Sequence, residues 1–122
     1  MKLTSLILTG FVAIEHVFIL VLEMFLWKTE FGMKVFQLTP ETAEITSKLA
    51  KNQGLYNGFL VAGILWGLCL SGQGQPYARD VLTFFLGCVV VAGAYGAMTV
   101  NIRILFVQAV PAIVGLALLW LA

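Results

Sequence analysis

The sequence of 122 residues has few charges, two cysteines and three prolines. Charged residues make up only 11% of it, whereas an average soluble domain has about 25%. The net charge of +1, the scattered lysines and the absence of an aromatic and basic module exclude a nucleic-acid-binding surface. Apolar residues make up 61% of the chain. The length and composition therefore predict a membrane protein with a single domain, residues 1–122.

The cysteines and the missing motifs exclude several kinds of chemistry. Cys69 and Cys88 form neither a CxxC pair nor a zinc-binding spacing, and we interpret both as small core residues. Nucleophile motifs, phosphate-binding loops and dinucleotide fingerprints are all missing from the sequence. We therefore expect no cofactor.

The first long apolar run, residues 3–27, is longer than the roughly 20 residues that cross a bilayer as a helix. No small-residue cleavage site follows Trp27, so we expect the run to be retained as an anchor. It contains Glu15, His16 and Glu23. Because a charge near the middle of such a helix costs about 2.5 to 3.5 kcal/mol, we expect these groups to face a bundle interior or a wet cavity.

The rest of the chain predicts three more membrane spans. Residues 28–39 alternate charged and apolar side chains, which is typical of a segment lying at the membrane interface. Thr39 and Pro40 favour a helix start near residue 40, before a second span over residues 49–70. The polar loop that follows suggests no chemistry. The last apolar tract is long enough for two spans, and we place the break at residues 100–103, giving spans 81–99 and 104–121.

These spans predict an all-α integral membrane protein, a bundle of four transmembrane helices with short loops and an interfacial segment after the first helix. The first and third loops carry most of the basic residues: Lys28, Lys34, Lys48, Lys51 and Arg103, against Lys2 and Arg79 on the other side. The positive-inside tendency then places these two loops in the cytoplasm. We expect a multi-pass protein of the cytoplasmic membrane with both termini outside the cytoplasm.

Polar side chains in the spans are concentrated toward one membrane surface. At about 100° per residue, the amides and phenol of residues 52–57 share one side of the second helix, and Gly54 and Gly58 lie on the other. The connectivity brings Glu23, Tyr95 and Gln108 toward that same surface, with the two ionisable groups at residues 15 and 16 deeper. We therefore predict one pocket in the cytoplasmic leaflet, lined by Glu15, His16, Glu23, Asn52, Gln53, Tyr56, Asn57, Tyr95 and Gln108.

Each polar group also has a purely structural interpretation. Glu23 would then be a structural carboxylate that is hydrogen-bonded to Asn52, Tyr56 or Asn57. Glu15 and His16 would be a neutral, hydrogen-bonded pair that specifies the register of the helices. Ionisable residues inside a membrane are nevertheless a functional hypothesis by default, so these three residues of the first helix are candidates for proton relay or acid and base catalysis. We expect no metal, because adjacent Glu and His differ from the Glu-x-x-His spacing of di-iron bundles.

Three functions fit this pattern. The first is a protein that binds a small polar or amphipathic molecule in the membrane, with proton-coupled transport as one form of it. The second is an enzyme that uses Glu15 and His16 as acid and base on a lipid-soluble substrate. The third is a structural or assembly subunit. Four crossings leave little room for a translocation path, so transport would require a homodimer.

The chain resembles a known family in several stretches. These are Glu15-His16, the run from Glu23 to Trp27, the block Asn-Gln-Gly-Leu-Tyr-Asn-Gly at residues 52–58, Tyr95-Gly-Ala97 and Gln108. Together they resemble a family of small, four-pass prokaryotic membrane proteins catalogued as a domain of unknown function, over nearly the whole chain. The resemblance implies an integral four-helix fold of bacterial type. It brings no activity, cofactor or catalytic residue.

Overall fold

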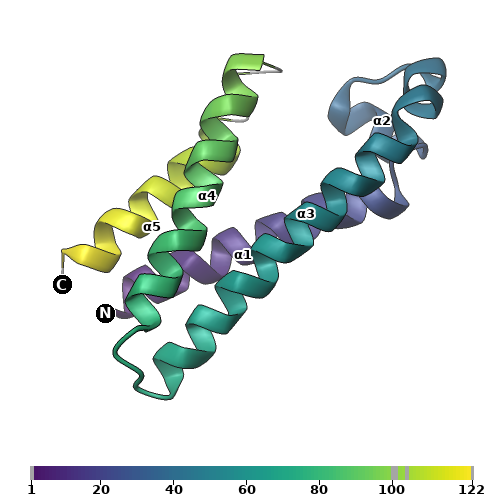
Figure 1. Ribbon diagram of the computed structural model, residues 1–122. Coiled ribbons are helices and arrows are strands. Elements are labelled where there is room, and N and C mark those ends of the chain that lie inside the picture. Colours follow the sequence, from purple (N-terminus) through teal and green to yellow (C-terminus); the bar gives the residue numbers. More distant parts are fainter. Residues whose placement is uncertain (1, 100–101, 104, 122) are drawn as a thin grey trace. The chain divides into compact units, whose positions relative to one another are not determined.

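The computed structural model describes residues 2–99, 102–103 and 105–121. Every regular element in this part of the chain is helical, which confirms the all-α prediction (Figure 1). The elements in chain order are α1 (Leu3–Phe25), α2 (Glu30–Phe36), α3 (Pro40–Gly72), α4 (Ala78–Thr99), the π-helix η1 (Leu105–Ala109) and α5 (Val110–Trp120).

Three of these helices, α1, α3 and α4, are long and apolar enough to cross a membrane. This finding supports the prediction of a membrane protein. The apolar stretch Phe106–Trp120 is shorter, so the fourth crossing stays a prediction. The break predicted at residues 100–103 lies partly outside the described residues. On either side of it, α4 ends at Thr99 and η1 begins at Leu105.

The long helix α3 begins at Pro40, with the backbone N–H of Thr42 donating to the Thr39 hydroxyl oxygen at 3.1 Å. Its 33 residues correspond to roughly 50 Å of helix, whereas the hydrocarbon core is about 30 Å thick. The helix is thus longer than a single crossing requires, and its amino-terminal turns carry Glu41 and Glu44.

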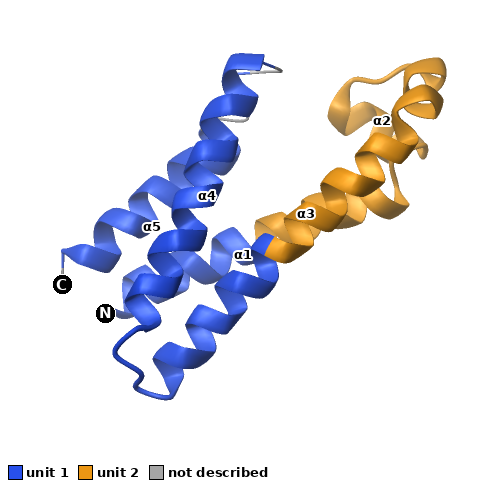
Figure 2. Ribbon diagram, in the orientation of Figure 1, with its two compact units in different colours: residues 1–14, 60–122 blue, residues 15–59 orange. Residues whose placement is uncertain are grey.

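The chain forms two compact units (Figure 2). Unit 2, residues 15–59, contains the carboxyl half of α1, the short α2 and the amino half of α3. The hydroxyl of Thr29 caps α2 by accepting from the N–H of Gly32 at 3.1 Å, and Gln37 ends the helix in the left-handed region at a φ of 56°. Trp27 packs on Phe36 with ring centroids 4.8 Å apart, which holds α2 against the end of α1.

Unit 1 comprises residues 1–14 and 60–122. Its buried apolar core draws on the start of α1, the end of α3, and α4 and α5: Val12, Ala13, Ile64, Leu82, Leu86, Val89, Ala112 and Leu119. Glycines let these helices approach closely. A Cβ on Gly63 would collide with the ring of Phe85, and one on Gly67 with the side chain of Leu82. Helix packing in lipid depends on such small residues because the lipid tails are themselves apolar.

The π-helix η1 lies directly before Val110 and Pro111. A proline inside a helix removes one backbone donor and crowds the carbonyl four residues earlier. A π-helical turn relieves this conflict by shifting the hydrogen-bond register. The change of helix type thus falls in the turn that directly precedes Pro111. Ala109 at the end of η1 packs against Gly93 of α4.

Gly93→Ala should destabilise the protein by about 1 to 3 kcal/mol, because an added Cβ would lie 2.9 Å from the backbone nitrogen of Ala109. Gly87→Ala is the matched control on the same helix, since nothing lies within 4 Å of its Cβ position. It should be neutral or stabilise by up to about 1 kcal/mol through helix propensity. Denaturant unfolding in a single detergent measures both variants, and equal stabilities would contradict this packing.

Candidate functional site

One hydrogen bond joins the acidic part of α1 to the amide-bearing part of α3. The side-chain N–H of Asn57 donates to Oε1 of Glu23 at 2.6 Å, and both residues are half-buried in unit 2. A short bond from an amide to a carboxylate is stronger than a bond between neutral groups. Glu23 therefore has a partner of its own, one of the three that its sequence context allowed.

Gly54 explains why this bond forms. A Cβ on Gly54 would lie 3.3 Å from both the Cβ of Glu23 and the backbone oxygen of Leu20, so the two helix backbones nearly touch there. Asn57 is three residues further along α3 and about 60° around the helix from Gly54, at the edge of the amide side that is nearest to the glycine side. The glycine side of α3 thus packs on α1 and brings Asn57 with it.

The other polar residues of α3 do not take part in this contact. Asn52, Gln53 and Tyr56 are exposed, and the Tyr56 ring lies beside Phe59 with centroids 6.2 Å apart. Of the four residues that the sequence placed on a common amide and phenol side, Asn57 is the one that bonds to an acid of α1 within the described part of the chain. The remaining three present hydrogen-bonding groups at the surface of unit 2.

The pair Glu15 and His16 lies within the apolar part of α1. His16 is fully buried, whereas Glu15 is partly buried. Within the described residues, Oε1 of Glu15 is a buried side-chain oxygen with no hydrogen-bond partner. Native structures satisfy most buried polar atoms, so an unsatisfied carboxylate oxygen needs an explanation.

Tyr95 and Gln108 belong to unit 1, whereas the other seven residues of the predicted pocket belong to unit 2 (Figure 2). Tyr95 is 68% exposed and lines a shallow apolar groove along the outer side of α4. Gln108 lies in η1 and is half-buried. A common pocket for all nine residues stays a prediction.

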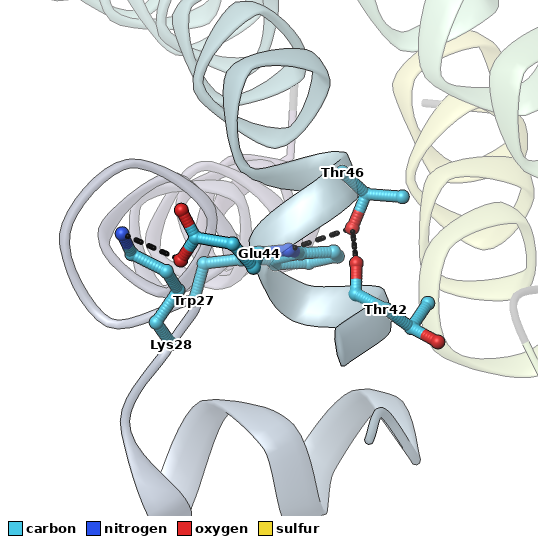
Figure 3. Close-up of polar contacts among 5 residues, drawn as sticks. All are labelled: Trp27, Lys28, Thr42, Glu44 and Thr46. Carbon is cyan, nitrogen blue, oxygen red and sulfur yellow. Dashed lines mark hydrogen bonds and ion pairs between the residues drawn. The ribbon is translucent and has the colours of Figure 1, made fainter. Parts of the chain in front are cut away.

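A polar network near the carboxyl end of α1 was not anticipated from the sequence (Figure 3). The indole N–H of Trp27 donates to the Thr46 hydroxyl at 3.0 Å, and that hydroxyl donates to the Thr42 carbonyl at 2.6 Å. Lys28 pairs with Glu44 at 3.2 Å. Because the ion pair is exposed it contributes little, about 0 to 1 kcal/mol. The network mainly fixes Trp27 at the end of the hydrophobic span, where tryptophans are common.

No group of three His, Cys, Asp or Glu side chains is placed to hold a metal ion in the part of the chain that the structure describes. The candidate residues of unit 2 carry carboxylates, an imidazole, amides and a phenol. These groups bind ligands by hydrogen bonds and exchange protons.

Comparison with known proteins places this chain among its relatives. A family model described as a protein of unknown function (DUF1304) matches residues 10–120. The chain belongs to the DUF1304 family. The uncharacterized protein YpaA of Lactococcus lactis subsp. lactis (strain IL1403) is 30% identical over 118 residues, which cover 95% of this chain and 96% of the relative. No solved structure matches. The DUF1304 match spans every residue of the predicted pocket and brings no activity with it.

Asn57→Ala should destabilise the protein by about 1 to 3 kcal/mol, because it leaves the Glu23 carboxylate without its donor. Glu23→Gln is the matched variant, since its amide oxygen can still accept from Asn57, and it should cost less. Thermal unfolding in detergent orders the two variants. If Asn57→Ala has the same melting temperature as the wild-type protein, the bond does not hold α1 to α3.

Proposed function

We propose that this DUF1304 protein is a four-pass protein of the cytoplasmic membrane that binds a small polar or amphipathic molecule beside α1 and exchanges a proton with it. The observation that carries the proposal is the unsatisfied, buried oxygen of Glu15 next to the fully buried His16. Leaving a buried acceptor unsatisfied costs about 1 to 3 kcal/mol. A ligand that donates a hydrogen bond, or a proton, removes that cost.

The spacing along α1 supports proton exchange. Glu15 is about 18 Å along the helix from Leu3, near the middle of a bilayer, and Glu23 is about 12 Å further on. His16 and Glu23 are seven residues apart and lie on nearly the same side of the helix. Titratable groups therefore occur at two depths on one side of α1, an arrangement typical of intramembrane relays.

The exposed groups on α3 support a binding role. Asn52, Gln53 and Tyr56 are within one to five residues of Asn57, and their amides and hydroxyl offer both donors and acceptors. We propose that the polar end of the bound molecule meets these groups near the membrane surface, with its remainder directed toward Glu15.

The fourth span is assigned to residues 104–121. The apolar stretch Phe106–Trp120 covers about 22 Å as a helix, and α5 and η1 both pack against α4. Helices with a local change of type still cross membranes where neighbouring helices cover them. With four spans, both termini lie on the outer side of the membrane, and transport by so small a bundle would use a homodimer.

Four crossings predict that reporters fused to the amino and carboxyl termini report the same compartment. Because basic residues are concentrated in the first and third loops, both should report the outer side. Paired fusions to a reporter active only in the cytoplasm and to one active only outside it make the measurement. Opposite readings for the two termini would show an odd number of spans and remove the fourth.

The binding role predicts that a small molecule copurifies with the protein in mild detergent. Glu15→Gln should lower its occupancy about tenfold, because a charged acceptor contributes roughly 1.5 to 3 kcal/mol. Glu41→Gln, at an exposed position in the first turn of α3, is the control and should leave occupancy unchanged. Native mass spectrometry of both variants with wild type measures the occupancy.

Two results would contradict this proposal. Wild-type protein without any bound molecule, or equal occupancy in Glu15→Gln, would remove the binding site. Chemical conversion of an extracted lipid pool by the wild type, lost in variants of both Glu15 and His16, would instead establish the acid and base enzyme that the same residues allow.

A further inference from the structure

A second pocket lies in unit 1, where the loop between α3 and α4 meets the end of α5. Its polar lining includes Ser71, Gln75, Arg79 and Asp80, and the Trp120 ring forms part of its wall. The volume of about 630 Å³ falls within the range of about 300 to 1,000 Å³ that small-molecule sites occupy. This pocket was not predicted from the sequence, because a loop rich in Gly, Gln and Pro resembles an ordinary connection.

The pocket lies where a membrane surface is expected. Helix α3 ends at Gly72 and α4 begins at Ala78, so the loop between these two proposed spans turns at one surface of the bilayer. The last helical residue of α5, Trp120, reaches the same pocket. Tryptophan is enriched at headgroup depth, where its ring is apolar and its N–H is polar.

The Arg79 side chain is held in place by its neighbours. Its guanidinium carbon lies 4.9 Å from the centroid of the Trp120 ring, a cation–π contact. The indole N–H of Trp120 donates to the Thr83 hydroxyl at 2.8 Å, and that hydroxyl donates to the backbone carbonyl of Arg79 at 2.7 Å. The Thr83 hydroxyl therefore orients the Trp120 ring, and the ring contacts the guanidinium.

Among the described residues, no oppositely charged side chain pairs with either of the two charges in this pocket. Within the described ranges the ion pair is that of Lys28 with Glu44, so neither Arg79 nor Asp80 has an oppositely charged side chain within 4 Å. The stacking on Trp120 occupies one face of the guanidinium, while its N–H groups lie at the edges and remain available for an anion. The positive end of the α4 dipole adds to the same preference.

We infer that this pocket binds the phosphoethanolamine headgroup of a bilayer lipid. Arg79 binds the phosphate oxygens, since its planar fork matches them. Asp80 binds the ammonium group, which distinguishes this zwitterion from an anionic lipid. Leu6 and the Trp120 ring provide apolar surface at the pocket for the glycerol and the first carbons of the acyl chains. The inference is independent of the function proposed for Glu15.

The test uses the purified full-length protein in detergent micelles containing either phosphatidylethanolamine or phosphatidylglycerol, with bound lipid counted by native mass spectrometry. Wild type should prefer phosphatidylethanolamine. Arg79→Gln should lower binding of both lipids about tenfold, the loss expected for a charge-assisted bond. Asp80→Asn should lower only phosphatidylethanolamine binding and thus abolish the preference. Lys28→Gln, outside the pocket, is the control and should behave as wild type.

Thermal melting of each variant separates lost binding from lost folding, and Arg79→Lys, which keeps the charge, should recover part of the binding. Preserved preference in Asp80→Asn, or wild-type binding in Arg79→Gln, would overturn the inference. Free phosphoethanolamine serves as a competitor. If it displaces the lipid at equal concentration, the ligand is a soluble phosphoethanolamine compound and the assignment to a lipid is wrong.

Discussion

Hydrocarbon offers no hydrogen-bond partners, and this constraint accounts for most of what the chain does in its spans. Backbone groups are satisfied within helices, and short hydroxyl side chains bond to the preceding turn, as Thr9 does to the Ser5 carbonyl at 2.7 Å. Glu23 takes its donor from Asn57. Glu15 departs from this pattern through one buried oxygen, and for that reason it marks the most promising position for chemistry.

Close packing at glycines makes these polar contacts possible. Because lipid tails are as apolar as leucine, helices in a membrane associate through shape and hydrogen bonds rather than through the hydrophobic effect. Gly54 allows the α1 and α3 backbones to approach until the Asn57 amide reaches the Glu23 carboxylate. In unit 1, Gly93 gives Ala109 of η1 the same kind of access to α4.

The pocket around Arg79 depends on the tertiary structure, although the loop beside it contains no recognisable motif. Arg79 and Trp120 are far apart in the sequence, and neither residue belongs to a motif. Their contact depends on α5 packing along α4, which brings the end of one helix beside the start of the other. The sequence therefore showed a basic residue near a loop, and the structure showed its guanidinium over the Trp120 ring at the wall of a pocket.

By itself, the sequence determined the membrane class, the helical fold and the identity of the ionisable groups inside the spans, because hydropathy, length and the insertion cost of a charge are properties of local stretches. Only the tertiary structure decided that Asn57, rather than Asn52 or Tyr56, binds Glu23, and that Lys28 pairs with Glu44. Choices of this kind depend on how each helix is rotated and on its register against its neighbour. Those quantities are set by contacts between residues far apart in the chain, such as Gly54 with Leu20, and no local pattern encodes them.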